Sequence, residues 1–156
     1  MRRKDREIAD PAEIRAVLER ARVMHLGLYD GEYPYVVPMH YGFTLEDGRL
    51  TLYAHCAKEG RKLELLRRDG RVFAAIDTDE ALIPGKSACA WGAAYACVMV
   101  RGRAVIVEDE DEKRRALSLL MKTQTGRDFA ISPAMAAAVC VLRIDAEEVS
   151  AKARRP

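Results

Sequence analysis

The sequence lacks a long apolar run, a paired cysteine motif and an excess of charge of one sign. No apolar stretch reaches the roughly 18 residues that a membrane-spanning helix needs, and the opening residues MRRKDREIAD contain no hydrophobic core of a secretory signal. We therefore expect a cytoplasmic protein that does not enter a membrane. The cysteines are widely spread and form no CxxC pair, which favours buried free thiols over a zinc site.

The charges nearly cancel, and aromatic residues are few. The 26 basic and 24 acidic residues leave a net charge of +2, and aromatic residues make up 6% of the chain. Proteins that bind nucleic acid usually carry a strong basic excess and aromatic side chains on which bases stack. We therefore expect no nucleic-acid partner. A chain of 156 residues suits one domain. We predict a single domain over 1–156, with an N-terminal arm at 1–9 and a basic tail at 151–156.

What the sequence does contain is a series of helix and strand patterns. Asp10 and Pro11 open the run DPAEIRAVLERAR as N-cap and first helical residue, and Gly126 ends a second helical run, DEDEKRRALSLLMKTQTG. Alternating apolar residues predict six strands. Their runs are VMHLGLY, PYVVPMHYGF, RLTLYAH, RVFAAID, AYACVMVRGRAVIVED and AAVCVLRIDAEEV.

Turn signals separate several of these runs. Asp30-Gly31 and Asp47-Gly48 indicate tight turns between antiparallel strands. Gly102, inside the longest β run, indicates a bend, a bulge or a close approach of two backbones. The run ALIPGKSACAWGAA is rich in small and turn-forming residues and is interpreted as a loop. Together these patterns predict a small antiparallel β-barrel with a few flanking helices.

One motif collects cations where a short helix begins. In YAHCAKEGRKLELL, Lys58, Gly60, Arg61 and Lys62 stand at the predicted helix N-terminus, where unpaired N–H groups already favour anions. Gly60 lets an anion approach the backbone, Arg61 can grip two phosphate oxygens, and the lysines act as point charges. A bound phosphate would satisfy all of these groups. The alternative is a set of solvated cations, with Arg61 or Lys62 paired to a nearby acid.

The run PYVVPMHYGF contains two prolines, which cannot donate to a β ladder. Pro34 and Pro38 therefore indicate an edge or an interrupted strand, with free backbone groups that can bind the polar edge of a flat ring. Apolar Val36, Val37 and Met39 could pack against such a ring. We expect this strand to lie next to the one that carries the cation motif. A phosphate at one end and a planar ring beside a sheet predict a mononucleotide-like cofactor.

These runs, together with ALSLLMKTQTG, resemble the flavin-binding split-barrel proteins related to pyridoxamine 5′-phosphate oxidase. The chain is most similar to their nitroimidazole-resistance (Nim) branch, and the resemblance extends from DREIAD to RIDAEEVSAK. It implies a mainly β fold with flanking α-helices, a six-stranded antiparallel split β-barrel of the FMN-binding type. It also implies a homodimer that holds two FMN molecules at the subunit interface.

The resemblance also implies which residues bind FMN. The ring would lie against the segment that the following residues form: Val36, Val37, Pro38, Met39 and His40. The phosphate would meet Lys58, Gly60, Arg61 and Lys62, with Tyr53 and His55 nearby. The partner subunit would contribute Tyr95 and Cys97. This chain has Ala96-Cys97 where the family usually has an Arg-Ser pair, which removes a cation and a hydroxyl from that side. Arg101 or Arg103 could compensate.

By this resemblance the chain is an FMN-dependent oxidoreductase that reduces nitro-aromatic compounds, with His40 and His55 as candidate catalytic residues. Either histidine could donate a proton to substrate, bind the flavin or ligate haem. His25 is interpreted as structural, and Trp91 as a core residue or a cover over substrate. Two other functions stay open on the same fold. One is a non-catalytic flavin- or haem-binding carrier, and the other is a deazaflavin-dependent reductase.

Overall fold

The computed structural model describes residues 3–155 as a mainly antiparallel β structure with flanking helices. Its elements follow in the order η1 (Lys4–Arg6), β1 (Glu7–Ile8), α1 (Pro11–Arg20), β2 (Val23–Tyr29), β3 (Pro34–His40), β4 (Gly42–Glu46), β5 (Arg49–Cys56), α2 (Arg61–Arg68), β6 (Arg71–Ile83), η2 (Ala88–Ala90), β7 (Gly92–Ile106), α3 (Glu110–Thr125), α4 (Pro133–Ala137) and β8 (Cys140–Arg154).

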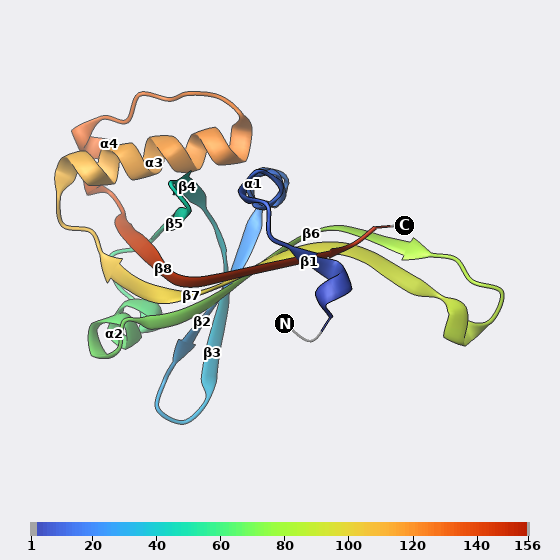
Figure 1. Ribbon diagram of the computed structural model, residues 1–156. Helices are drawn as coiled ribbons and strands as arrows, with labels where there is room; N and C mark the ends of the chain where they lie inside the picture. Colours follow the sequence, from blue (N-terminus) through green and yellow to red (C-terminus); the bar gives the residue numbers. More distant parts are fainter. Residues whose placement is uncertain (1–2, 156) are drawn as a thin grey trace.

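The eight strands form one sheet that curls around a core (Figure 1). Its order is β3-β2-β6-β7-β8-β5-β4, and β1 pairs separately with β8. The prediction of an antiparallel split barrel is confirmed, but the count of six strands was wrong. The run PYVVPMHYGF divides into β3 and β4 at Tyr41, and Glu7–Ile8 adds a two-residue strand.

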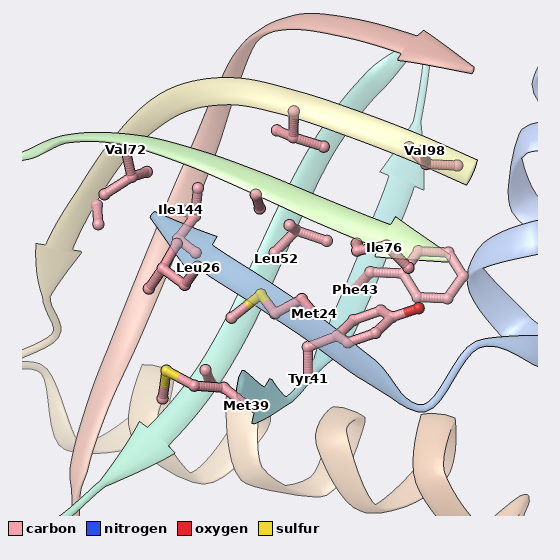
Figure 2. Packing of buried hydrophobic residues seen from close by; sticks show 14 of the residues in the cluster. Met24, Leu26, Met39, Tyr41, Phe43, Leu52, Val72, Ile76, Val98 and Ile144 are labelled. Carbon is pink, nitrogen blue, oxygen red and sulfur yellow. The ribbon is translucent and has the colours of Figure 1, made fainter. Parts of the chain in front are cut away.

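The interior of the barrel is filled by alternate side chains from most strands (Figure 2). Successive strand residues point to opposite faces, so an apolar residue at every second position builds a continuous core. Met24, Leu26 and Leu52 are fully buried in it. Tyr41 is also fully buried, and its hydroxyl donates a hydrogen bond to the Leu18 carbonyl at 2.7 Å. Tyr41 thereby joins the corner between β3 and β4 to the end of α1.

Both long predicted helices are confirmed, with the predicted N-cap at Asp10 and the predicted end at Gly126. The Asp10 carboxylate accepts a hydrogen bond from the Ala12 amide at 2.9 Å, with Pro11 as the first residue of α1. The Asp109 carboxylate accepts one from the Glu112 amide at 2.7 Å, and Gly126 closes α3 in the left-handed conformation. In Figure 1, α3 lies over β4 and β5, and α1 packs beside β6 and β7.

The segment 81–94, predicted as a loop, has strand residues at both ends, and its middle, 84–91, connects them as the loop of a β-hairpin that contains η2. Ala81 pairs with Ala94 and Ile83 pairs with Gly92, so β6 and β7 continue well past the barrel (Figure 1). The segment's small residues have weak strand preference, and the pairing of its two halves overrides that preference. Trp91 lies next to the tip of this hairpin and is 50% exposed, so the prediction of a core tryptophan was wrong.

The predicted arm and tail pair with one another instead of extending freely. Glu7 lies opposite Lys152 and Ile8 lies opposite Ala151, which places residues 151–154 inside β8. Residues 1, 2 and 156 of the predicted arm and tail lie outside the described residues. Across residues 3–155, no helix is both long and apolar enough to cross a lipid bilayer.

Gly102 marks a β-bulge, as its position in the longest run predicted. The register between β7 and β8 shifts between Arg101 and Gly102. A Cβ at Gly102 would lie 2.2 Å from the Asp145 carbonyl oxygen, far inside van der Waals contact. The two strands therefore approach each other more closely here than any residue with a side chain allows.

Candidate functional site

The cation motif forms the turn between β5 and α2, as predicted. Leu63, Leu65 and Leu66 are buried, and they anchor α2 against the barrel. Gly60 precedes the helix with a φ of 134°, a conformation that favours glycine. It carries no side chain that could cap the helix. The first intrahelical bonds run from the Leu63 and Glu64 amides to the Gly60 carbonyl, at 3.0 and 3.3 Å. The amides of Arg61 and Lys62 precede these bonds and are available to an anion.

A small pocket opens at this turn. Its volume is about 140 Å³, and it is lined by Tyr35, Cys56, Ala57, Glu59, Gly60, Arg61, Lys62 and Leu63. The pocket is the size of a small anion and is too small for a three-ring heterocycle. Gly60, Arg61 and Lys62, which were predicted to bind a phosphate, are among these lining residues. Lys58 is an exposed residue of the same turn and does not line the pocket.

Arg61 is held by two residues of the β2–β3 hairpin. Its guanidinium donates to the Asp30 carboxylate at 2.5 Å and lies over the Tyr35 ring at 5.5 Å. Asp30 is itself fixed, because its other oxygen accepts from the amides of Glu32 and Tyr33 at 3.0 and 2.7 Å. These two amides, with Arg61, hold the pKa of Asp30 below its usual value. The alternative foreseen for the motif, a cation paired to an acid, therefore applies to Arg61, while Lys62 stays unpaired among the described residues.

The run PYVVPMHYGF was predicted to lie next to β5, and only its last part pairs with that strand. Gly42 and Phe43 of β4 pair with Tyr53 and Leu52 of β5, whereas Pro34–His40 form β3 and pair with β2. The two segments still meet, because Tyr35 of β3 and Cys56 of β5 line the same pocket. β3 is the first strand in the sheet order, and β4, which follows β3 in the sequence, is the last. The pocket therefore lies at the seam, the opening between the two edges of the sheet. Pro34 and Pro38 therefore lie on an edge strand, as predicted.

The five residues predicted to face a ring divide between two faces of β3. Val36, Pro38 and His40 are exposed on the outer face, whereas Val37 is half-buried and Met39 is buried among core residues. Side chains alternate along a strand, so these five cannot all present side chains to one ring. A ring on the outer face would meet the side chains of Val36, Pro38 and His40, and the contact of all five residues with a ring stays a prediction.

The candidate catalytic histidines lie apart from the pocket. The His40 Nδ1 lies 2.9 Å from the Arg22 carbonyl oxygen. A carbonyl oxygen can only accept a hydrogen bond, so Nδ1 carries the hydrogen and donates it. Nε2 is the other ring nitrogen and is left for a second interaction. His55 is exposed near the end of β5, opposite Val141. His25, interpreted as structural, is half exposed, with Nδ1 3.6 Å from the Asp77 carboxylate.

Tyr53 belongs to the α3 side of the sheet. It packs with Val107, Ala116 and Val141, and burial raises its pKa, with the Glu112 carboxylate acting in the same direction. This explains why the side chain does not reach the pocket. The resemblance predicts Tyr53 near the flavin phosphate, and within this chain Tyr53 does not line the pocket.

Tyr95 and Cys97 lie on β7, away from the turn. Tyr95 stacks beneath the Lys152 ammonium at 5.7 Å and accepts from Arg6 at 3.4 Å. Cys97 lies between Asp77 and Lys152 in the register of the sheet. Their assignment to the partner subunit's site stays a prediction. Arg101 and Arg103, the possible substitutes for the missing arginine, pair with Glu148 and Glu147 at 3.0 and 3.2 Å.

Sequence reasoning missed two contributors to the site and a second pocket. Asp30 was interpreted only as a turn residue, and Tyr35 was not singled out, because both lie far from Arg61 in the sequence. The second pocket, about 350 Å³, lies between α1 and the β6–β7 hairpin. Several alanines line it, together with the Arg20–Asp79 ion pair at 2.6 Å. No sequence motif signalled this pocket.

The open antiparallel split barrel is a fold that this chain shares with a flavin-binding protein of known structure. The chain belongs to the pyridoxamine 5′-phosphate oxidase family, whose model matches residues 10–153. A comparison with curated proteins finds no match.

Solved structures of related fold include proteins that bind flavin. A proposed 5-nitroimidazole antibiotic resistance protein from Bacteroides thetaiotaomicron has 30% identity and a TM-score of 0.80, with 94% of this chain and 86% of that chain covered. An FAD-binding protein from Mesorhizobium loti has 27% identity and a TM-score of 0.67, with 96% and 98% covered. The flavocytochrome Anf3 from Azotobacter vinelandii has 21% identity and a TM-score of 0.79, with 100% and 72% covered.

Proposed function

We propose that the protein is a homodimeric FMN-dependent oxidoreductase that reduces nitro-aromatic compounds. The observation that carries the proposal is the turn at the start of α2, where two free amides and the unpaired Lys62 surround a pocket of about 140 Å³. A phosphate monoester matches this pocket in size, charge and hydrogen-bonding capacity. The likeness to a proposed nitroimidazole resistance protein, at 30% identity, supports the substrate class.

The outer face of the barrel supports a ring site and an interface. Val36 is 57% exposed and Phe73 is 49% exposed, and both lie opposite Gly27 in the sheet. Gly27 leaves bare backbone between the two apolar side chains. Apolar side chains this exposed indicate a surface that a partner or a ligand covers. Val36, Pro38 and His40 would contact the ring, and a second copy of the chain would cover the rest of this face.

The residues of this chain would bind, orient and shield the cofactor. FMN supplies, when bound, a two-electron carrier that passes electrons to the nitro group. Arg61 and Lys62 would hold the phosphate, and Asp30 would fix the orientation of Arg61. β3 pairs on one edge with β2, so its other edge has N–H and C=O groups for the polar edge of the ring. His40 would hold its transferable proton at Nε2, since Nδ1 is engaged by Arg22.

The test compares FMN with riboflavin, which has the ring but no phosphate. Each flavin is titrated into the purified protein and binding is followed by flavin fluorescence. We expect Lys62→Ala and Arg61→Ala to weaken FMN about 10- to 100-fold, since each removes a charge-assisted hydrogen bond of about 1.5–3 kcal/mol. Riboflavin affinity should stay the same. Arg67→Ala, at the exposed far end of α2, is the matched control and should leave both affinities unchanged.

Equal losses of affinity for FMN and riboflavin would show that the phosphate does not bind at this turn. If neither flavin binds, the proposal that the protein is a flavoprotein is refuted. Activity is tested separately, by following loss of nitro-group absorbance when chemically reduced, FMN-loaded protein is mixed with a 5-nitroimidazole. His40→Gln should slow this step even when the protein is saturated with FMN. Oxidation of the flavin at the rate of free FMN would refute nitro reduction by the protein.

A non-catalytic flavin carrier is the second candidate, and one observation favours it. His55 and His40 do not line the pocket, and Ala96-Cys97 supplies neither a cation nor a hydroxyl from β7. A carrier would bind FMN in the assay above and would give no acceleration of nitro reduction.

A further inference from the structure

Two cysteines lie directly opposite each other beside the candidate pocket. Cys56 is the last residue of β5, Cys140 is the first residue of β8, and the two are Cα partners in the antiparallel register. Directly opposed residues of antiparallel strands point to the same face, with Cβ atoms about 4.5–5.5 Å apart. The Cα separation of such a pair, about 4.5–5.5 Å, lies within the range that disulfides span, and the Cβ atoms must approach to about 3.5–4.5 Å for the bond to form. Both thiols are free in this structure.

The two thiols differ in exposure. Cys56 is half-buried and lines the pocket, whereas Cys140 is 8% exposed. Burial raises the pKa of the Cys56 thiol, the Lys62 ammonium lowers it, and the adjacent Cys140 thiol raises it again. Because Cys56 is the more exposed of the two, a reagent in solvent reaches Cys56 before it reaches the buried Cys140 thiol.

The other two cysteines have no such partner. Cys97 lies between Asp77 and Lys152 in the sheet, and Cys89 is exposed in η2. Among residues 3–155, Cys56 and Cys140 are thus the one pair of cysteines placed opposite each other across two strands.

We propose that Cys56 and Cys140 form a reversible disulfide at the edge of the pocket. The oxidant class is a small-molecule disulfide, such as oxidised glutathione. The Cys56 thiolate attacks one sulfur of the reagent, forms a mixed disulfide and releases the first small thiolate. The Cys140 thiolate then attacks the Cys56 sulfur and releases the second. Two protein thiols and one reagent disulfide become one protein disulfide and two small thiols.

The site is a modification site and needs no bound flavin. Cys56 is joined by one residue to the turn that begins at Lys58, so a bond to β8 restrains the start of that turn. An effect on FMN affinity would rest on the proposed function, and formation of the disulfide would not.

The experiment uses the full chain carrying Cys89→Ser and Cys97→Ser, which leaves only the proposed pair. The protein is equilibrated at mildly alkaline pH with mixtures of oxidised and reduced glutathione, native or in urea. Remaining thiols are alkylated, and the products are measured by intact mass and peptide mapping. We expect the native protein to be half-oxidised in a glutathione mixture at least about tenfold more reducing than the mixture that half-oxidises it in urea. A tenfold difference corresponds to about 30 mV for this two-electron couple.

The matched control carries Cys56→Ser and Cys89→Ser, which leaves Cys97 and Cys140. This variant should show no intramolecular disulfide in the native state. Accumulation of a stable glutathione adduct on Cys56, or half-oxidation no easier in the native protein than in urea, would overturn the proposal. FMN titration of the oxidised and reduced forms is a separate readout. Disulfide formation without any flavin binding would refute the proposed function and leave this site standing.

Discussion

The buried hydroxyl of Tyr41 gives a sharp test of how the barrel is held to α1. Tyr41 is fully buried between β3 and β4, and its hydroxyl donates to the Leu18 carbonyl at 2.7 Å (Figure 2). Leu18 belongs to the last turn of α1, where carbonyls have no intrahelical partner. Tyr41→Phe keeps the ring and removes the hydroxyl. The Leu18 carbonyl is then left buried without a donor.

An unsatisfied buried carbonyl costs about 1–3 kcal/mol. We therefore expect Tyr41→Phe to lower the free energy of unfolding by about 2 kcal/mol and the melting temperature by about 4–8 °C in a chain of this size. Urea and thermal unfolding followed by circular dichroism measure both. Tyr29→Phe is the matched control, because the Tyr29 hydroxyl also donates to a carbonyl, that of Gly31 at 2.8 Å, but Tyr29 is 58% exposed. Water replaces that hydroxyl, so the change should stay under about 0.5 kcal/mol. Equal losses in the two variants would refute this reasoning.

Three further predictions follow from contacts described above. Gly102→Ala places a methyl group 2.2 Å from the Asp145 carbonyl oxygen and should cost about 3 kcal/mol in urea unfolding; a loss under about 1 kcal/mol would contradict the close approach of β7 and β8. Asp30→Asn keeps an oxygen for the two amides but loses the charge. Because the pKa of Asp30 is lowered in the folded state, its stabilisation is complete above the ordinary value of about 4 and is lost as the pH falls through the lowered value. The variant should therefore be less stable at neutral pH, and its free energy of unfolding should fall less steeply as the pH is lowered. An unchanged dependence of stability on acid pH would contradict the role given to Asp30. Phe73→Asp places a charge on the exposed apolar face, so the proposed dimer should dissociate in sedimentation analysis, and an unchanged mass would move the interface elsewhere.

Features set by neighbouring residues could be predicted from the sequence. Asp10 caps α1 through an amide two residues away, and Gly126 ends α3 through its own conformation. The Gly102 bulge was also signalled by a single residue out of pattern. The turn before α2 was found in the same way, because Gly60 and its cations are adjacent in the sequence. Local chemistry fixed each of these features.

Features that depend on distant pairing could not be predicted. The strand Glu7–Ile8 exists because β8 passes beside it, and nothing in two residues signals that. The hairpin beyond Ala81 is held by its own opposite half. Arg61 contacts Asp30 only after the sheet has curled. For this reason the sequence indicated a turn at Asp30 and not its contact with Arg61. In each case the deciding contact joins segments far apart in the chain.

The pairing of β1 with β8 brings the two ends of the described chain into neighbouring strands. Arg6 contacts Tyr95, and Tyr95 lies opposite Arg154, so a short glycine-rich linker can bridge the ends without disturbing a pair. The Asp47-Gly48 turn, exposed between β4 and β5, offers a place for new ends. A circular permutant opened there would keep every strand pairing of the barrel. β5 and the cation turn would then be synthesised first, and the β2–β3 hairpin followed by β4 last.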